Sequence, residues 1–262
     1  MDKKVGIDAG STLIKLAYNE NGTYHFKKYS YQQMDSLLQW LQMSAPDARW
    51  NVTGGKGHHF LSISDNSREV AEFSAITDGA MYMTAAQKLN VKNYILVNIG
   101  TGTSFFSIKD NSAEHLYGSG TGGGMLMGLS RMLVGERPFS DLAALAESGN
   151  RAKLDLQVRD IYASEPPISG DYTASNFGKA TTADVKKEDV TASLFGLIAE
   201  TTMLLGVQSA KAAGEVDIVY TGGMTAHPYM EKSLKAATEA FGCKAHFLAN
   251  GQFCGAMGAL IY

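Results

Sequence analysis

Two short turns rich in glycine, serine and threonine, each joining two strand-like segments, constrain the fold of this chain more than any other feature. The first, Ala9-Gly10-Ser11, follows an apolar strand pattern that ends on Asp8. The second, Gly100-Thr101-Gly102-Thr103, follows the apolar segment 93–98 and precedes another strand pattern. Turns of this kind present backbone N–H groups and hydroxyls to a phosphate. Two of them at matching positions predict two lobes that hold a nucleotide in the cleft between them.

The predicted elements support two lobes because a similar order of strands and helices occurs in each half of the sequence. Apolar runs, alternation and helical spacing predict three strands, a helix, a strand and a helix in the first half, at residues 5–8, 12–18, 23–29, 32–43, 50–53 and 74–89. The second half opens with three strands and continues with a helix, a long buried helix, a strand, a helix and a C-terminal helix, at residues 93–98, 104–108, 114–117, 125–133, 189–213, 216–220, 225–241 and from 253. We therefore expect an α/β protein with an N-terminal lobe of residues 1–91 and a C-terminal lobe of residues 92–262.

Composition excludes several classes of function. The formal net charge is -3 and no basic block occurs, so the electrostatic footprint of a nucleic-acid binder is missing. No uninterrupted apolar run reaches the roughly 18 residues of a membrane span, and the apolar stretch after the N-terminus is too short for a signal peptide. The two cysteines, Cys243 and Cys254, form no zinc spacing. We expect a cytoplasmic protein with reduced thiols and no membrane partner.

The residues around the first turn are suited to a phosphate and a hard cation. Asp8 can hold Mg²⁺ directly or through water, because hard cations prefer oxygen ligands. Lys15, in the strand that follows, can add a positive charge. An ordinary hairpin turn favours the same residue types, so this cluster alone leaves both interpretations open. No GxxxxGK(S/T) motif occurs, which excludes a P-loop protein.

Two further glycine clusters precede predicted helices. The segment 118–124, Gly-Ser-Gly-Thr-Gly-Gly-Gly, matches GxGxxG but lacks the strand–helix–strand context and the ribose-binding acid of a dinucleotide fold. Glycines at a helix N-terminus can let a nucleotide approach closely, although a flexible loop has the same composition. Gly222-Gly223 follows the strand at 216–220, and its alternative is a helix-entry turn.

Glu72 is the candidate general base. It is expected to end a short apolar strand just before the helix at 74–89, where its carboxylate would face a cleft between the lobes. A carboxylate in that place can accept the proton of an attacking hydroxyl during phosphoryl transfer. The alternative is an acidic residue that stabilises the N-terminus of the helix.

At this level of detail the sequence resembles a known family. The N-terminal Asp-Ala-Gly-x-Thr and the second glycine-threonine turn are similar to those of actin, heat-shock ATPases and sugar kinases. Glu72-Phe73 before a helix of small residues, Asn-Ile-Gly-Thr-Gly-Thr-Ser at 98–104, Gly-Thr-Gly-Gly-Gly at 120–124, Asp-Leu-Gln-Val-Arg-Asp-Ile-Tyr at 155–162 and the segment 165–178 resemble bacterial type II pantothenate kinases. The resemblance runs nearly from end to end.

The resemblance implies two actin-like lobes and an enzyme that phosphorylates pantothenate with ATP to 4'-phosphopantothenate, the first step of coenzyme A synthesis. It implies that Glu72 is the general base. The residues implied to hold the ATP phosphates and Mg²⁺ are Asp8, Ala9, Gly10, Ser11, Thr12, Leu13, Ile14, Lys15 and Thr101. Those implied to line the nucleoside are Gly123, Gly124, Met125, Leu126, Met127, Phe139 and Gly223. Thr173 would lie near the pantothenate channel, and the family is usually dimeric.

The sequence departs from the family pattern at three places. Ser11 stands where glycine is common, and Gly223 replaces a serine of some relatives. His115 stands where some bacterial relatives carry an arginine that meets the pantothenate carboxylate. A neutral histidine donates one hydrogen bond where arginine offers a charged fork. Two alternatives therefore stay open: another kinase of the superfamily, such as an amino-sugar kinase, and a regulator that binds ATP without turnover.

Overall fold

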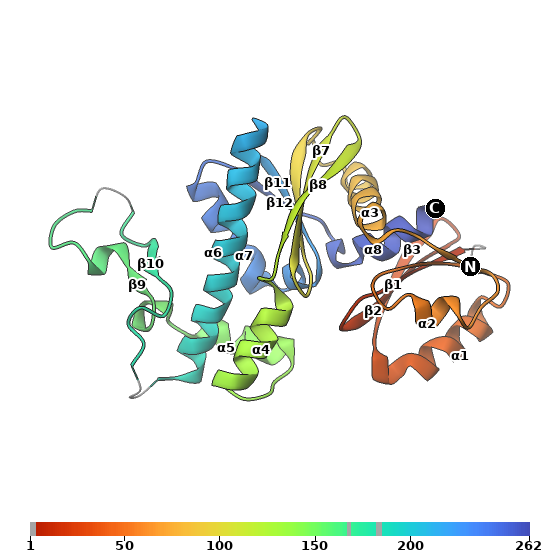
Figure 1. The fold of residues 1–262 in the computed structure, drawn as a ribbon, viewed down its shortest axis with the longest axis horizontal. Helices are drawn as coiled ribbons and strands as arrows, with labels where there is room; N and C mark the ends of the chain where they lie inside the picture. Colours follow the sequence, from red (N-terminus) through yellow and green to blue (C-terminus); the bar gives the residue numbers. More distant parts are fainter. Residues whose placement is uncertain (1–3, 167–168, 182–184) are drawn as a thin grey trace.

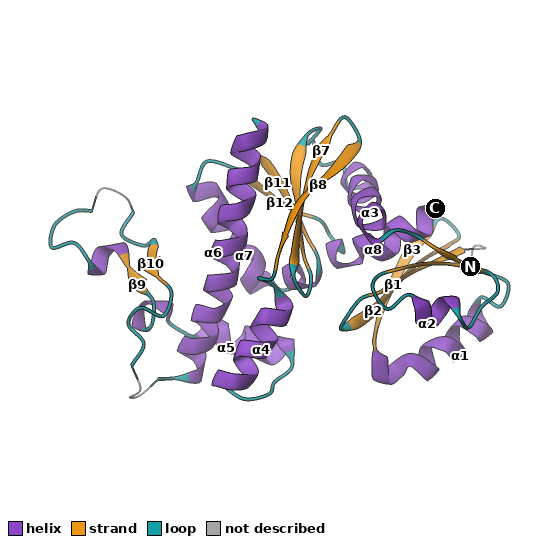
Figure 2. Cartoon of the chain, viewed as in Figure 1, coloured by secondary structure: helices purple, strands orange, loops and turns teal. Residues whose placement is uncertain are grey.

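Two five-stranded sheets with the same strand order form the framework of the protein. The computed structural model describes residues 4–166, 169–181 and 185–262. The first sheet has the order β3-β2-β1-β4-β5 and the second β8-β7-β6-β11-β12. In each sheet the first three strands in chain order form an antiparallel meander. The fourth strand pairs in parallel with the first, and the fifth pairs in parallel with the fourth. The repeated order of elements predicted from the sequence is thus confirmed in space (Figure 2).

The first half of the chain supplies one sheet and its helices. Its strands are β1 (Lys4–Ala9), β2 (Leu13–Glu20), β3 (Thr23–Ser30), β4 (Arg49–Thr53) and β5 (Ser67–Glu69). Its helices are α1 (Met34–Ser44), α2 (His58–Leu61) and α3 (Glu72–Ala86).

The second half supplies the other sheet, a small hairpin and five helices. Its strands are β6 (Tyr94–Ile99), β7 (Thr103–Lys109), β8 (Ser112–Ser119), β9 (Leu156–Gln157), β10 (Thr173–Ser175), β11 (Asp217–Thr221) and β12 (Lys244–Phe247). Its helices are α4 (Gly123–Leu133), α5 (Phe139–Ser148), α6 (Lys187–Ala213), α7 (Pro228–Ala240) and α8 (Cys254–Ile261).

Most predicted elements are present, and the differences lie where the local pattern is short. Glu72 does not end a strand, since it is the first residue of α3. The short helix α2, which contains His58 and His59, was not among the predicted elements. The helix expected at 225–241 is interrupted before Pro228, which lacks the N–H that an uninterrupted helix would need. The sequence did not predict β5, β12 or α5, because these segments show no clear periodicity. Within the family-like segment 165–178, residues 167–168 lie outside the described residues.

The two faces of the first sheet are covered by helices from opposite ends of the chain. Alternate residues of β1, among them Val5 and Ile7, pack in a core with Leu37 and Leu41 of α1. The C-terminal helix α8 contacts β1, β2 and β4. It comes so close that a Cβ on Gly6 would lie 2.0 Å from the carbonyl oxygen of Ala256.

Helix α3 crosses α8 with the two backbones in contact. A Cβ on Gly79 would lie 1.9 Å from the carbonyl oxygen of Cys254, and one on Gly258 would lie 1.7 Å from that of Ala75. On its other side α3 packs against the second sheet, in a core that contains Tyr94 and Leu96. Figure 1 shows α3 and α8 between the two sheets. These two helices therefore join the halves of the molecule.

The second sheet is covered by the long helix α6. Its buried residues lie on several sides of the helix, as the sequence predicted, and Phe195, Ile198 and Val207 are fully buried. By length and composition α6 is apolar enough to cross a membrane, an exception to the expectation that no such stretch exists. However, 72% of its most apolar window is buried inside the protein. In this fold α6 serves as the central core helix.

The contact between α3 and α8 gives a test of the fold. Gly79→Ala should lower the free energy of unfolding by roughly 1–3 kcal/mol, because the added methyl must displace the backbone of Cys254. Gly128→Ala in α4 is the matched control, since nothing lies within 4 Å of its added Cβ. There the helix propensity of alanine should stabilise by roughly 0.5–1 kcal/mol. Urea unfolding measures both, and a stabilised Gly79→Ala would contradict the packing.

Candidate active site

The first turn is held in shape by residues that are distant in the sequence. The backbone N–H of Gly10 donates to the carbonyl oxygen of Leu13 at 3.2 Å. The hydroxyl of Tyr31 donates to the carbonyl oxygen of Gly10 at 2.6 Å. Lys56 donates to the same turn twice, from its backbone N–H to Ala9 O at 3.0 Å and from Nζ to Ser11 O at 2.7 Å. The turn is thus fixed before any ligand binds.

Asp8 lies at the base of this turn with very little free space around it. A Cβ on Gly54 would lie 2.8 Å from Oδ1 of Asp8, and one on Gly255 would lie 2.9 Å from Oδ2. The Nζ of Lys15 is 3.6 Å from Oδ2. Burial raises the pKa of Asp8 above its usual value, and Lys15 opposes that increase. The two glycines leave the carboxylate open to a small ligand on its remaining side.

Several predicted phosphate-binding residues offer only their backbone to this site. The side chains of Ala9 and Ile14 are fully buried in the core of the first lobe. The neighbouring Leu13 is partly exposed, and Ser11 and Thr12 are exposed. The predicted role of residues 8–15 therefore divides between the side chains of Asp8, Ser11, Thr12 and Lys15 and the backbone of the others.

Glu72 is exposed at the N-terminus of α3. The charges of Asp8 and Lys15 both act on its pKa. Desolvation raises the pKa of Glu72, and the nearby Asp8 carboxylate raises it further, whereas Lys15 lowers it. A helix N-terminus favours the charged form of a carboxylate and so lowers its pKa, which is opposite to the shift of Glu72. Glu72 therefore lies near enough to Asp8 and Lys15 for both charges to act on its pKa.

The second turn is supported by the glycine cluster that follows it. Gly100 donates to Gly102 O at 2.8 Å, while the N–H groups of Gly123 and Gly124 donate to the carbonyls of Gly100 and Thr101, also at 2.8 Å. These first N–H groups of α4 are therefore used within the protein. The cluster was expected to offer a helix N-terminus to the nucleotide, but two of its donors instead stiffen the turn.

The two turns contact each other. The hydroxyls of Ser11 and Thr101 lie 2.5 Å apart, although 90 residues separate them in the sequence. The expectation that the two turns face each other is confirmed by this contact. It also gives Ser11, which stands where relatives commonly have glycine, a specific partner in the opposite lobe.

The residues predicted to line the nucleoside gather at one end of the second sheet. A Cβ on Gly123 would lie 3.3 Å from the sulfur of Met224, and one on Gly223 would meet nothing within 4 Å. The ring of Phe139 lies 6.2 Å from that of His227, edge to face. His227 was not singled out from the sequence, because a lone histidine before a proline carries no signal of its own.

The methionines and leucine of α4 have different environments. The side chain of Leu126 is fully buried in the core of the second lobe, and Met127 packs partly against that core. Met125 is exposed. Of the three, Met125 has the side chain best placed to contact a ligand, and any contact of Leu126 would run through its backbone.

His115 lies beside the candidate base. It is in the middle of β8, where the pairing with β7 shifts register, and not at a strand end. Its ring stacks on that of Phe73 at 4.4 Å and meets Phe106 edge to face at 5.2 Å. Because Phe73 follows Glu72 directly, this contact places the exposed ring of His115 beside the first turn of α3, where Glu72 lies.

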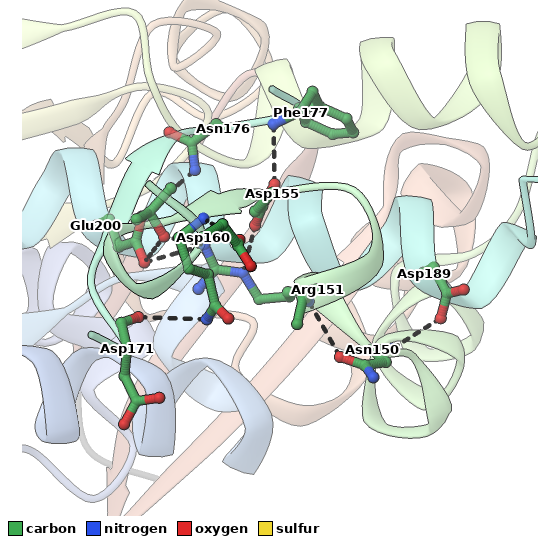
Figure 3. Close-up of polar contacts among 12 residues, drawn as sticks. Asn150, Arg151, Asp155, Asp160, Asp171, Asn176, Phe177, Asp189 and Glu200 are labelled. Atoms are coloured by element: carbon green, nitrogen blue, oxygen red, sulfur yellow. Dashed lines mark hydrogen bonds and ion pairs between the residues drawn. The ribbon is translucent and has the colours of Figure 1, made fainter. Parts of the chain in front are cut away.

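Thr173 lies elsewhere in the chain. Its hydroxyl donates to Glu200 at 2.9 Å and accepts from Arg151 at 3.2 Å, in a polar network that ties the 150–181 segment to α6. Figure 3 shows the centre of this network, in which Arg151 also pairs with Asp155. The β9–β10 hairpin lies on the opposite side of α6 from α3 (Figure 1). Within one chain, the structure therefore does not bring Thr173 to Glu72.

The donor set at the first turn suits Mg²⁺. Among the described residues no group of three or more His, Cys, Asp or Glu side chains forms a self-sufficient metal site. Mg²⁺ in kinases usually binds to one or two carboxylates together with substrate phosphates and water. A single carboxylate such as Asp8, bounded by two glycines, agrees with that pattern.

Sequence comparisons find relatives that are similar to this chain over nearly its whole length. A sequence profile of the Fumble family matches residues 53–262. The type II pantothenate kinase of Oceanobacillus iheyensis is 39% identical over 263 residues, with 99% of each chain covered. The type II pantothenate kinase of Bacillus cereus strain AH820 is 35% identical over 270 residues, covering 100% of this chain and 98% of the relative.

Comparisons of structure extend to more distant proteins. Component A of (R)-2-hydroxyglutaryl-CoA dehydratase from Acidaminococcus fermentans superposes with a TM-score of 0.65 at 19% identity, covering 99% of this chain and 96% of that one. A glucokinase of the ROK family from Streptomyces griseus, in complex with glucose and AMPPNP, gives 0.57 at 11% identity, with 98% of each chain covered. These likenesses show the fold alone, and they confirm the predicted two-lobed, actin-like architecture.

Proposed function

The chain belongs to the Fumble family and to its type II pantothenate kinases, and on that premise we propose that it transfers the γ-phosphoryl group of ATP to the primary hydroxyl of pantothenate. The product is 4'-phosphopantothenate, at the first step of coenzyme A synthesis. The observation that carries the proposal at the site is the contact between the two turns through Ser11 and Thr101, with Glu72 near enough to Asp8 and Lys15 for both charges to act on its pKa.

The residues of this chain divide the reaction between them. The hydroxyl oxygen of the acceptor forms a bond to the γ-phosphorus, while the bond from that phosphorus to the oxygen bridging it to the β-phosphorus breaks and ADP leaves. Glu72 takes the proton of the attacking hydroxyl. The raised pKa of Glu72 favours this role, because a stronger base accepts the proton more readily.

Asp8 and the two turns hold the phosphates. Asp8 would hold Mg²⁺ directly or through water, and the cation, when bound, would neutralise charge on the phosphate oxygens. The backbone of residues 9–14 and the hydroxyls of Ser11 and Thr101 would contact the phosphates from opposite lobes. Met125, Phe139 and Gly223 would lie along the nucleoside, with His227 behind Phe139.

A homodimer accounts for the place of Thr173. If Thr173 lines a pantothenate channel, a second copy must bring it there, because in one chain β10, which contains Thr173, lies across α6 from α3, which begins at Glu72. We propose that two chains associate in the cytoplasm and that each completes the substrate channel of the other. Light scattering should give about twice the chain mass of 28.1 kDa, and a monomer at micromolar concentration would remove this role for Thr173.

The alternatives predict different substrates for the same fold. An amino-sugar kinase would share the architecture, as the likeness to a putative N-acetylmannosamine kinase from Listeria monocytogenes shows at 12% identity. A regulator would bind ATP and release no ADP. Coupled assays of ADP release with pantothenate, N-acetylmannosamine and no acceptor separate the three. We expect turnover with pantothenate alone; turnover only with the amino sugar, or none with either, would reject the proposal.

Glu72 gives the first test of mechanism. Glu72→Gln preserves shape and removes the base, so kcat should fall by roughly 10²–10⁴-fold with ATP affinity nearly unchanged. Glu69→Gln, on an exposed position of β5, is the control and should leave kcat unchanged. Because the deprotonated form is the base, kcat/KM should fall as pH falls through a pKa above the ordinary glutamate value of about 4.3. Unchanged turnover in Glu72→Gln would mean that the base lies elsewhere.

His115 gives a second test, directed at the substrate carboxylate. A neutral histidine donates one hydrogen bond, whereas arginine offers a charged fork. If His115 contacts the carboxylate of pantothenate, His115→Arg should lower the KM for pantothenate and His115→Ala should raise it, while the KM for ATP changes little. An unchanged KM for pantothenate in both variants would reduce His115 to a ring that packs on Phe73.

A further inference from the structure

Lys56 places a positive charge beside the first turn. The residue roles proposed above do not include that charge. It belongs to the glycine-rich segment after β4, and its Nζ lies 2.7 Å from the carbonyl oxygen of Ser11. Its backbone N–H donates to Ala9 O at 3.0 Å. The close approach depends on Gly54, whose φ of +90° and lack of a side chain let this segment lie against Ala9 and Asp8.

The charge of Lys56 is positioned without being neutralised. Its Nζ lies 4.1 Å from the centre of the Tyr31 ring, a cation–π geometry that fixes the ammonium group and leaves its charge intact. In the described part of the chain no carboxylate forms an ion pair with Lys56. Lys15, the other cation of this turn, is paired with Asp8. An ammonium group has three N–H donors, and the bond to Ser11 uses one of them.

The position of Lys56 corresponds to the end of the nucleotide that reacts. The proposed nucleoside residues lie in the second lobe, and Thr101 touches Ser11 where the lobes meet. A triphosphate that begins at the second lobe therefore places its last phosphate against the first turn. Phosphoryl transfer spreads negative charge over the oxygens of that phosphate, and preorganised cations stabilise the charge.

We propose that Lys56 is a further catalytic residue, whose ammonium group contacts the γ-phosphoryl group while Tyr31 and Ser11 hold it in place. This inference rests on the proposed function for the identity of the nucleotide and does not depend on the acceptor. Lys56 then supplies the free cation of the first turn, and Lys15 compensates Asp8.

Direct binding distinguishes contact with the γ-phosphate from support of the turn. Lys56→Gln retains a donor for Ser11 O and removes the charge, so affinity for the non-hydrolysable analogue AMPPNP should fall by about 10–100-fold, as expected for one charge-assisted hydrogen bond. Affinity for ADP should change by less than about twofold by the same reasoning. Lys56→Arg should retain most of the AMPPNP affinity. Calorimetric titration measures all three without any acceptor present.

Tyr31→Phe is the control for the turn itself. It removes the hydrogen bond to Gly10 O and keeps the aromatic ring beneath Lys56. If Lys56 only braces the turn, Lys56→Gln and Tyr31→Phe should lower AMPPNP and ADP affinity alike, and that result would overturn the proposal. Unchanged AMPPNP affinity in Lys56→Gln would overturn it too. Wild-type protein that binds neither nucleotide would reject the proposed function together with this inference.

Chemical rescue adds a readout that a structural role does not give. Lys56→Cys should lose AMPPNP affinity, and alkylation with 2-bromoethylamine should restore it by rebuilding an ammonium side chain. The native Cys243 and Cys254 are both buried, and burial raises the pKa of both thiols, so they should react slowly. Wild-type protein treated in the same way controls for their modification, and absence of rescue in a folded, fully alkylated variant would contradict a role for the charge.

Discussion

The close crossing of α3 and α8 is the contact on which the rest of the site depends. Gly79 and Gly258 allow the two helices to touch through their backbones. The same helix α8 presents Gly255 to Asp8 and Ala256 to Gly6 of β1, so α8 contacts α3, the first sheet and the site together. Because α3 begins at Glu72, its angle to α8 decides where the candidate base points relative to Asp8. A helix from the end of the chain thus positions residues from its beginning.

Electrostatics at the site follow from this packing. Burial raises the pKa of Glu72, and the nearby Asp8 carboxylate raises it further, because a second negative charge disfavours ionisation. Lys15 partly compensates Asp8, and Lys56 remains as a charge held by an aromatic ring and a carbonyl oxygen. The arrangement is suited to a reaction in which an incoming polyphosphate supplies the missing negative charge and a hydroxyl supplies the proton.

In the proposed function, nucleotide binding and acceptor recognition fall to different parts of the chain. The two turns, which contact each other through Ser11 and Thr101, belong to the framework common to the actin-like fold. Features that would recognise an acceptor lie outside that framework: His115 on the Phe73 ring, and Thr173 in the network around Arg151. Their separation within the monomer is the physical reason why a second copy enters the proposed function.

The sequence by itself determined the strands, most helices, the two turns and the family, because strand alternation, helical spacing and glycine-rich turns are local patterns that a single chain displays. It also singled out Asp8 and Glu72, although it placed Glu72 at a strand end. Only the tertiary structure decided that Glu72 begins a helix, that Gly79 meets Cys254, and that Lys56 and Tyr31 hold the first turn. These contacts join residues 21 to 175 positions apart, and no local pattern encodes such pairings. They arise when the helices and loops pack, since the cost of closing long segments is offset only in the complete fold.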